Sequence, residues 1–223
     1  SRDELGRVMQ QFCGLRALVI GDLILDNYVD CQPLGMSAED PTIVVSPLAS
    51  KYFLGGARIV AAHAVGLGLA TTFISITGQD EEAERCAQML DGYGVSAHLF
   101  PDHDRPTTLK TRYRAGGKTL LRVNRLRDQE VDEALSKKIL SEAMDRLSQI
   151  DVLIFSDFSY GLLGEKIVDS LIKAALIKGV LIAADSQSSS QIGDITKFKG
   201  ATLTTPTERE ARLATRDTRT GLV

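Results

Sequence analysis

The sequence has few cysteines and histidines, and neither type is arranged for a structural site. Its three cysteines, Cys13, Cys31 and Cys86, are widely spaced and form no C-x-x-C pattern. This spacing argues against a disulfide framework or a zinc site, and it favours a reducing compartment, which we expect to be the cytoplasm. The three histidines also lack metal-ligand spacing. We therefore expect no metal ion bound by these side chains.

Long hydrophobic runs and an excess of positive charge are absent as well. No apolar run approaches the ~20 residues of a membrane span, and residues 1–4 are too charged for a signal peptide. The net charge of -3 gives no general attraction to nucleic acid or to anionic lipid. With 43% hydrophobic and 25% charged residues among 223, the chain has the composition of an ordinary globular protein with a full core.

What the sequence does contain is an alternation of apolar strands and helices. Continuous Val, Ile and Leu strands that alternate with helices are typical of a parallel sheet, so we predict a doubly wound, mainly parallel α/β fold. The expected strands are 16–20, 71–77, 95–100, 151–155, 180–184 and 201–203, and the expected helices are 3–13, 56–66, 81–90, 132–147, 165–177 and 207–213.

Two polar segments interrupt this alternation. Residues 28–50 are broken up by Pro33, Pro41 and Pro47, and we expect an irregular excursion there with one strand at 42–46. Residues 107–124 are expected to form a hairpin. We interpret both segments as a lid or a subsidiary sheet.

Acidic residues follow several of the predicted strands. In parallel sheets, ligands bind outside the carboxyl ends of the strands. Asp22, Asp26, Asp80, Asp157 and Asp185 are therefore candidates for accepting hydrogen bonds from a polyol. For Asp80 and Asp157, capping of the following helix is an equally good interpretation.

Gly55 and Gly56 precede the apolar helix 56–66. Two glycines at this place let backbone N–H groups approach a ligand at the positive end of a helix, although a tight turn uses the same pair. The spacing is neither the dinucleotide fingerprint G-x-G-x-x-G nor a P-loop, which argues against a nucleotide-dependent oxidoreductase.

The hairpin carries basic residues whose convergence depends on the strand register. Lys110, Arg112 and Arg114 alternate and therefore share one face. A two-residue turn at 116–117 would pair Arg122 with Thr111 on the other face, whereas a three-residue loop would pair it with Lys110. Convergence would create a phosphate-binding surface. The alternative is a solvated polar face of an edge hairpin.

The order of these motifs resembles that of the ribokinase-like carbohydrate kinases. The segments that carry the resemblance are Gly21 to Asp26, Gly55-Gly56, Thr77 to Asp80 and Ser156 to Phe158. Residues 22–28, 37–41 and 108–112 are similar above all to the heptose-phosphate kinase domain of bifunctional ADP-heptose synthase. The similarity covers essentially the whole chain, so residues 1–223 are expected to be the N-terminal portion of one kinase domain.

This resemblance implies a Rossmann-like core with a β-clasp lid that also serves for dimerisation, and ATP-dependent phosphorylation of a sugar phosphate. Asp26, Gly55 and Gly56 would hold the sugar, and Lys110, Arg112 and Arg122 its phosphate group. Asp185 and Glu210 would lie near Mg²⁺ and the ATP phosphates. It also implies a possible fused nucleotidyltransferase domain.

The sequence departs from the family pattern at four positions. Ile59 stands where the family has Asn, Tyr160 where it has Lys, Gln187 in place of the Lys of Asp-Pro-Lys, and Thr207 in place of the Asn of N-x-x-E. The second family signature, D-T-x-G-A-G-D with the catalytic Asp, does not occur. We therefore expect the base beyond Val223, no tightly bound ATP or Mg²⁺, and no phosphoryl transfer by this chain alone. The alternative is a catalytically degenerate module that binds a sugar phosphate or dimerises.

Overall fold

The computed structural model describes residues 2–188, 191–217 and 220–221, so Val223 lies outside the described residues. Its centre is a six-stranded sheet in the order β10-β9-β8-β1-β4-β5, in which neighbouring strands are parallel. The predicted mainly parallel sheet is confirmed. Its strands are β1 (Arg16–Gly21), β4 (Ala70–Thr77), β5 (Ser96–Pro101), β8 (Val152–Asp157), β9 (Leu181–Ser186) and β10 (Leu203–Thr204).

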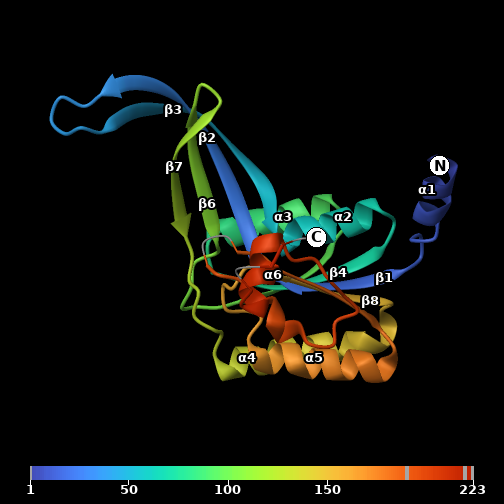
Figure 1. Cartoon of the computed structure of the whole chain (residues 1–223). Helices are drawn as coiled ribbons and strands as arrows, with labels where there is room; N and C mark the ends of the chain where they lie inside the picture. Colours follow the sequence, from blue (N-terminus) through green and yellow to red (C-terminus); the bar gives the residue numbers. More distant parts are fainter. Residues whose placement is uncertain (1, 189–190, 218–219, 222–223) are drawn as a thin grey trace.

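Helices cover both faces of this sheet (Figure 1). Successive residues of β1 point to opposite faces, so Leu18 and Ile20 join one hydrophobic cluster and Val19 joins the other. All three side chains are fully buried. The first cluster includes residues of α4 (Glu133–Arg146) and α5 (Glu165–Lys178), and the second includes residues of α2 (Ala57–Gly66) and α3 (Glu81–Gly92).

A second sheet of four strands rises away from the helices in the order β3-β2-β6-β7 (Figure 1). We call it the clasp sheet. Strands β2 and β6 are parallel, and the two outer pairs are antiparallel. The hairpin predicted at 107–124 is confirmed as β6 and β7. The strands are β2 (Leu23–Met36), β3 (Ile43–Gly56), β6 (Leu109–Ala115) and β7 (Lys118–Arg125).

The expectation of an irregular excursion over 28–50 is wrong, because residues 28–36 and 43–50 belong to two 14-residue strands. Pro33 and Pro47 lie at register shifts between β2 and β3, where a missing N–H is tolerated. β3 is moreover an edge strand, and β2 pairs with β6 only as far as Asp30. Prolines that suggest a broken segment are thus accommodated in long, bulged strands.

The remaining helices lie at the two ends of the chain. In Figure 1, α1 (Arg2–Gln10) projects from the end of the molecule opposite the clasp sheet. Helix α6 (Glu208–Thr215) begins one residue later than predicted, because Thr207 is its N-cap. Two 3₁₀ helices, Leu147–Gln149 and Ile195–Phe198, complete the fold. Among the described ranges, no helix combines the length and the apolarity that a membrane crossing requires.

Candidate functional site

One face of the clasp sheet gathers most of the residues predicted to bind substrate. Asp26 of β2 is in register with Lys110 of β6, and on its other side it pairs with Phe53 of β3. Residues in register share a face and alternate along each strand. We call this surface the charged face, and it consists of Asp26, Tyr28, Asp30, Lys51, Phe53, Lys110, Arg112, Arg114 and Arg122.

A β-bulge decides the position of Arg122. The turn is the two-residue one, with Ala115 opposite Lys118, but the register shifts between Tyr113 and Arg114. Arg122 consequently pairs with Arg112, so both registers considered from the sequence are wrong. The bulge inserts one extra residue, which returns Arg122 to the face that carries the other cations. The basic residues therefore converge by a device that turn length alone could not reveal.

Asp26 and Arg112 form an ion pair between Oδ1 and Nη1 on the charged face. The guanidinium groups of Arg112 and Arg114 lie 5.0 and 5.5 Å from the centre of the Tyr28 ring. Tyr28 in turn meets the Phe53 ring edge-on at 5.3 Å. Sequence reasoning missed both aromatic residues, although the alternation along β2 would have placed Tyr28 beside Asp26.

The two glycines of the predicted sugar-binding turn make room for protein atoms. A Cβ on Gly55 would lie 2.1 Å from Asp26 Oδ2, so only glycine lets the carboxylate lie against β3. Gly56 has φ +60° and is the N-cap of α2, and a Cβ there would lie 2.4 Å from the Asp22 carbonyl oxygen. That carbonyl also accepts the Ala57 N–H. These contacts explain the pair by close packing, a different reason from the ligand approach expected.

Asp22 is buried where β1 ends, under the loop that follows β8. Its Oδ2 accepts hydrogen bonds from the backbone N–H groups of Phe158 and Tyr160, at 2.7 and 3.3 Å. Its Oδ1 is buried and has no hydrogen-bond partner within the part of the chain that the structure describes. Burial and the Asp157 carboxylate raise the pKa of Asp22 to about 6. Burying a carboxyl group costs free energy unless its oxygens accept hydrogen bonds. Here the two hydrogen bonds to Asp22 fix the 158–160 loop.

Asp157 belongs to a buried polar cluster at the end of β8. Its Oδ2 pairs with Lys197 Nζ at 2.7 Å and accepts the Ser186 hydroxyl at 2.7 Å. Its Oδ1 accepts the Ser159 N–H at 3.1 Å. Asp80 caps α3 by accepting the Ala83 N–H, as the capping interpretation requires. Lys197 could not be singled out from the sequence, because its partner Asp157 lies 40 residues earlier.

Asp185 and Glu210, the predicted nucleotide-proximal residues, lie close enough to interact electrostatically at the ends of β9 and α6. Burial raises the pKa of Asp185, and Thr205 donates its hydroxyl to Oδ1. Burial alone would raise the pKa of Glu210, but N–H groups of Ser188 and Thr207 hold it below its ordinary value. Glu210 thus completes the capping box of α6 with Thr207.

The four family departures lie in different environments. Thr207 is the N-cap of α6, and Tyr160 is buried with a hydroxyl that meets no hydrogen-bond partner in the described ranges. Ile59 is half-buried in the first turn of α2. Gln187 is exposed, and its backbone N–H donates to the Asp157 carbonyl at 2.9 Å.

Arg58 is a fully buried cation that sequence reasoning also missed. Its Nη2 donates to the carbonyl oxygens of Ile24 and Phe53, at 2.9 and 3.0 Å. Its Nε and Nη1 have no hydrogen-bond partner among the described residues. Burial lowers its pKa. Arg58 therefore ties the first turn of α2 to both strands at the base of the clasp sheet, directly beside Asp26 and Gly55.

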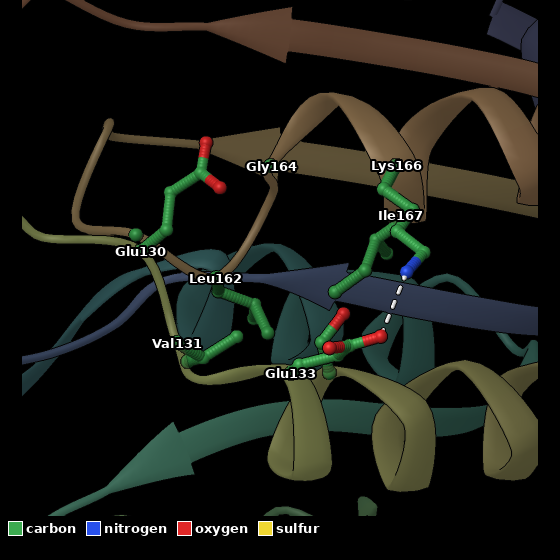
Figure 2. A pocket seen from close by; sticks show the side chains of 9 residues that line it. Glu130, Val131, Glu133, Leu162, Gly164, Lys166 and Ile167 are labelled. Atoms are coloured by element: carbon green, nitrogen blue, oxygen red, sulfur yellow. Dashed lines mark hydrogen bonds and ion pairs between the residues drawn. The ribbon is translucent and has the colours of Figure 1, made fainter.

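Several hollows lie near these residues, and one of about 640 Å³ is lined by Asp80 and the first turn of α3. Another of about 490 Å³ opens on the charged face and is lined by Asp26, Tyr28 and Arg114. A smaller one of about 230 Å³ lies between the N-terminal ends of α4 and α5, where Figure 2 shows Lys166 paired with Glu133. The Glu130 carboxylate lies against Gly164, the N-cap of α5. The hollow on the charged face is the candidate site, because it is lined by Asp26, the residue predicted to hold the sugar.

Comparisons with known proteins agree with this geometry. The family model described as pfkB family carbohydrate kinase matches residues 16–220. The bifunctional protein HldE of Helicobacter hepaticus is 34% identical over 201 residues, and that of Caulobacter vibrioides is 33% identical over 214. These matches cover 90% and 96% of the chain but 41% and 43% of the relatives, so the chain spans about two fifths of their length. The resemblance inferred from the motifs is confirmed.

Solved structures show the same fold at low sequence identity. An Arabidopsis thaliana ribokinase, solved with ribose and ATP, superposes with a TM-score of 0.66 at 17% identity. The superposition covers 91% of this chain and 63% of the ribokinase chain. Escherichia coli phosphofructokinase-2 superposes with a TM-score of 0.68 at 16% identity. The superposition covers 93% of this chain and 64% of the phosphofructokinase chain. The predicted ribokinase-like fold is thus confirmed.

Proposed function

The chain belongs to the pfkB family of carbohydrate kinases, and from this premise we propose that it binds a heptose phosphate for ATP-dependent phosphorylation of a sugar hydroxyl. The observation that carries the proposal is the pairing of Arg112 with Arg122. Like charges directly opposite each other destabilise a sheet, so their presence favours an anionic ligand. Lys110 and Arg114 lie on the same face. The phosphate already on the sugar suits these forked donors.

The sugar hydroxyls would contact Asp26, next to the glycine turn at Gly55 and Gly56. A carboxylate accepts hydrogen bonds from neighbouring hydroxyls, and this one lines the 490 Å³ hollow. Its ion pair with Arg112 keeps both groups on the charged face before the ligand arrives. We propose that the phosphate takes over part of the guanidinium, which leaves Asp26 freer to orient the sugar.

Asp185 and Glu210 would hold Mg²⁺ and the ATP phosphates from the neighbouring strand end. The donor set fits this group, because Mg²⁺ is usually held by one or two carboxylates together with substrate phosphates. When bound, the metal ion would neutralise charge on the transferring phosphoryl group. The role of this chain is to orient the acceptor sugar, since the catalytic base of the D-T-x-G-A-G-D signature is not among these residues.

Three further proposals concern partners and place. We propose a homodimer formed through the clasp sheet, because Leu34, Met36, Ile43 and Leu48 are apolar and largely exposed on its outer hairpin. We also propose a fused nucleotidyltransferase domain in the whole protein, which would agree with the bifunctional nature of its relatives. The three free cysteines support the cytoplasm as its compartment.

Isothermal titration of the 223-residue chain tests the binding proposal. We expect binding of a heptose phosphate, and affinity at least about tenfold lower for the unphosphorylated heptose, because a charge-assisted contact is lost. Arg122→Gln should weaken binding of the phosphate and leave that of the bare sugar unchanged. Lys138→Gln, an exposed cation on α4, is the matched control. Equal affinities for both sugars would contradict the proposal.

The second candidate is a module that binds a sugar phosphate without catalysis. It is favoured by Tyr160 and Thr207, which replace polar family residues and lie buried or engaged in a helix cap. An assay of the product of the complete gene, with ATP and heptose or hexose phosphates, separates the two. Turnover supports the kinase, whereas binding without turnover by a folded protein supports the module.

A further inference from the structure

Lys110 is an unusual lysine because the residue is almost completely buried. The residue is only 7% exposed, although lysines normally extend their charged end into solvent. Its Nζ lies 5.2 Å from the centre of the Tyr160 ring and 5.5 Å from that of Phe158. Both distances are within the range of cation–π attraction. Two aromatic rings therefore form a seat beneath the ammonium group.

This seat is rigidly attached to the core. The rings of Phe158 and Tyr160 stack at 6.3 Å with an interplanar angle of 30°. Asp22 accepts the N–H groups of both residues. Arg105 Nη1 donates to the Tyr160 carbonyl at 2.8 Å. Ser159 between the rings has φ +60°, a conformation that a non-glycine residue keeps only when its surroundings enforce it.

The seat places Lys110 where the two sheets meet. Lys110 is in register with Asp26, so its strand position is fixed by the clasp sheet. The rings come from the loop after β8, which belongs to the central sheet. An ammonium group held from both sides loses little further freedom when a ligand binds. Aromatic faces also attract a cation without adding a negative charge that would compete with an anionic ligand.

We propose that Tyr160, together with Phe158, is a positioning residue that holds the Lys110 ammonium for the phosphate group of the bound sugar. The proposal rests on the proposed function and assigns a use to Tyr160. The resemblance led us to expect a lysine at this position, so its replacement looked like a lost cation. Because the Lys110 ammonium lies on the Tyr160 ring, Lys110 of β6 supplies a positive charge at the place where the family has its lysine.

Nuclear magnetic resonance of the chain labelled with ¹³C at lysine Cε tests the seat directly. The Lys110 signal, assigned with Lys110→Arg, should be shifted upfield by the ring currents. Tyr160→Phe keeps the ring and should keep this shift, whereas Tyr160→Leu should remove a large part of it. Tyr93→Leu is the matched control, because Tyr93 is 55% exposed and follows α3. Phe158→Leu is the second variant if Tyr160→Leu does not fold.

Affinity for a heptose phosphate tests the use of the seat. We expect Tyr160→Leu to weaken binding about tenfold and Tyr160→Phe by no more than about twofold, as loss of a desolvated cation–π contact implies. Affinity for the unphosphorylated heptose should not change. An unmoved Lys110 signal, or equal effects of the Phe and Leu variants, overturns the inference. A wild-type chain without phosphate preference overturns the proposed function instead, even if the Lys110 signal moves as expected.

Discussion

The central sheet and the clasp sheet bury their residues very differently. In the central sheet, β1 packs against helix-bearing clusters on both of its faces, and five of its six residues are buried. In the clasp sheet, all eight residues of β7 are exposed. Burial makes the first region depend on apolar packing, whereas the second depends on register, bulges and charge. The hollow of the candidate site is lined by clasp-sheet residues, among them Asp26 and Arg114, whereas Asp185 and Glu210 lie at the ends of β9 and α6.

The largest expected effect concerns packing in the central sheet. Phe155→Ala should reduce the free energy of unfolding by about 3–5 kcal/mol, because it leaves a cavity in the core. Phe155 is fully buried and contacts the Phe198 ring at 5.2 Å. Leu121→Ala in β7, where the side chain is 57% exposed, should change stability by no more than about 0.5 kcal/mol. Urea unfolding measures both, and similar losses would break the comparison.

The second-largest expected effect is a pH dependence of stability that arises from Asp22, between β1 and β2. The pKa of Asp22 is raised to about 6 in the folded chain, above its unfolded value, so the folded state holds this proton more tightly. Stability from this group is therefore present below about pH 4 and is lost as the pH rises through about 6. Asp22→Asn removes the titration and keeps an acceptor oxygen for the 158–160 loop.

We accordingly expect the stability of Asp22→Asn relative to wild type to rise by about 2 kcal/mol between pH 4 and pH 7. Urea unfolding across that range provides the measurement, with Asp91→Asn, an exposed carboxylate on α3, as the control. A pH-independent difference would mean that Asp22 titrates alike in the folded and unfolded chain.

Arg58 tests how the two regions are joined. Arg58→Met preserves much of the buried volume but leaves the carbonyl oxygens of Ile24 and Phe53 without their donor. We expect a loss of about 1–3 kcal/mol, the cost of unpaired buried acceptors. Arg209→Met, at an exposed position of α6, should be close to neutral. A gain in stability for Arg58→Met would show that the desolvated charge costs more than its two hydrogen bonds return.

The same contrast explains which features the sequence could predict. Strands such as β1 and β8 are recognisable because burial on both faces demands continuous apolar residues. Strands β2 and β3 were not recognisable, because their prolines suggest a broken segment. In the structure these prolines fit at bulges and at a sheet edge. Of the site, the faces of Lys110 and Arg112 follow from alternation. The cross-strand partner of Arg122 depends on a bulge, and the residues that contact Lys197 and Tyr160 depend on tertiary packing. Alternation along a strand predicts neither.

The smallest expected effect separates stability from function within the clasp sheet. Arg122→Thr removes one of two directly opposed cations and introduces a residue that favours strands, so stability should rise by about 0.2–1 kcal/mol. The gain should shrink in 1 M salt, which screens exposed charges, while affinity for a heptose phosphate falls. Lys118→Thr at the turn end of β7, opposite Ala115, is the control, and should change neither property. If Arg122→Thr instead lowers stability at low salt, the pairing of Arg112 with Arg122 does not destabilise the sheet. The pairing then no longer supports an anionic ligand, and the proposed function loses its main observation.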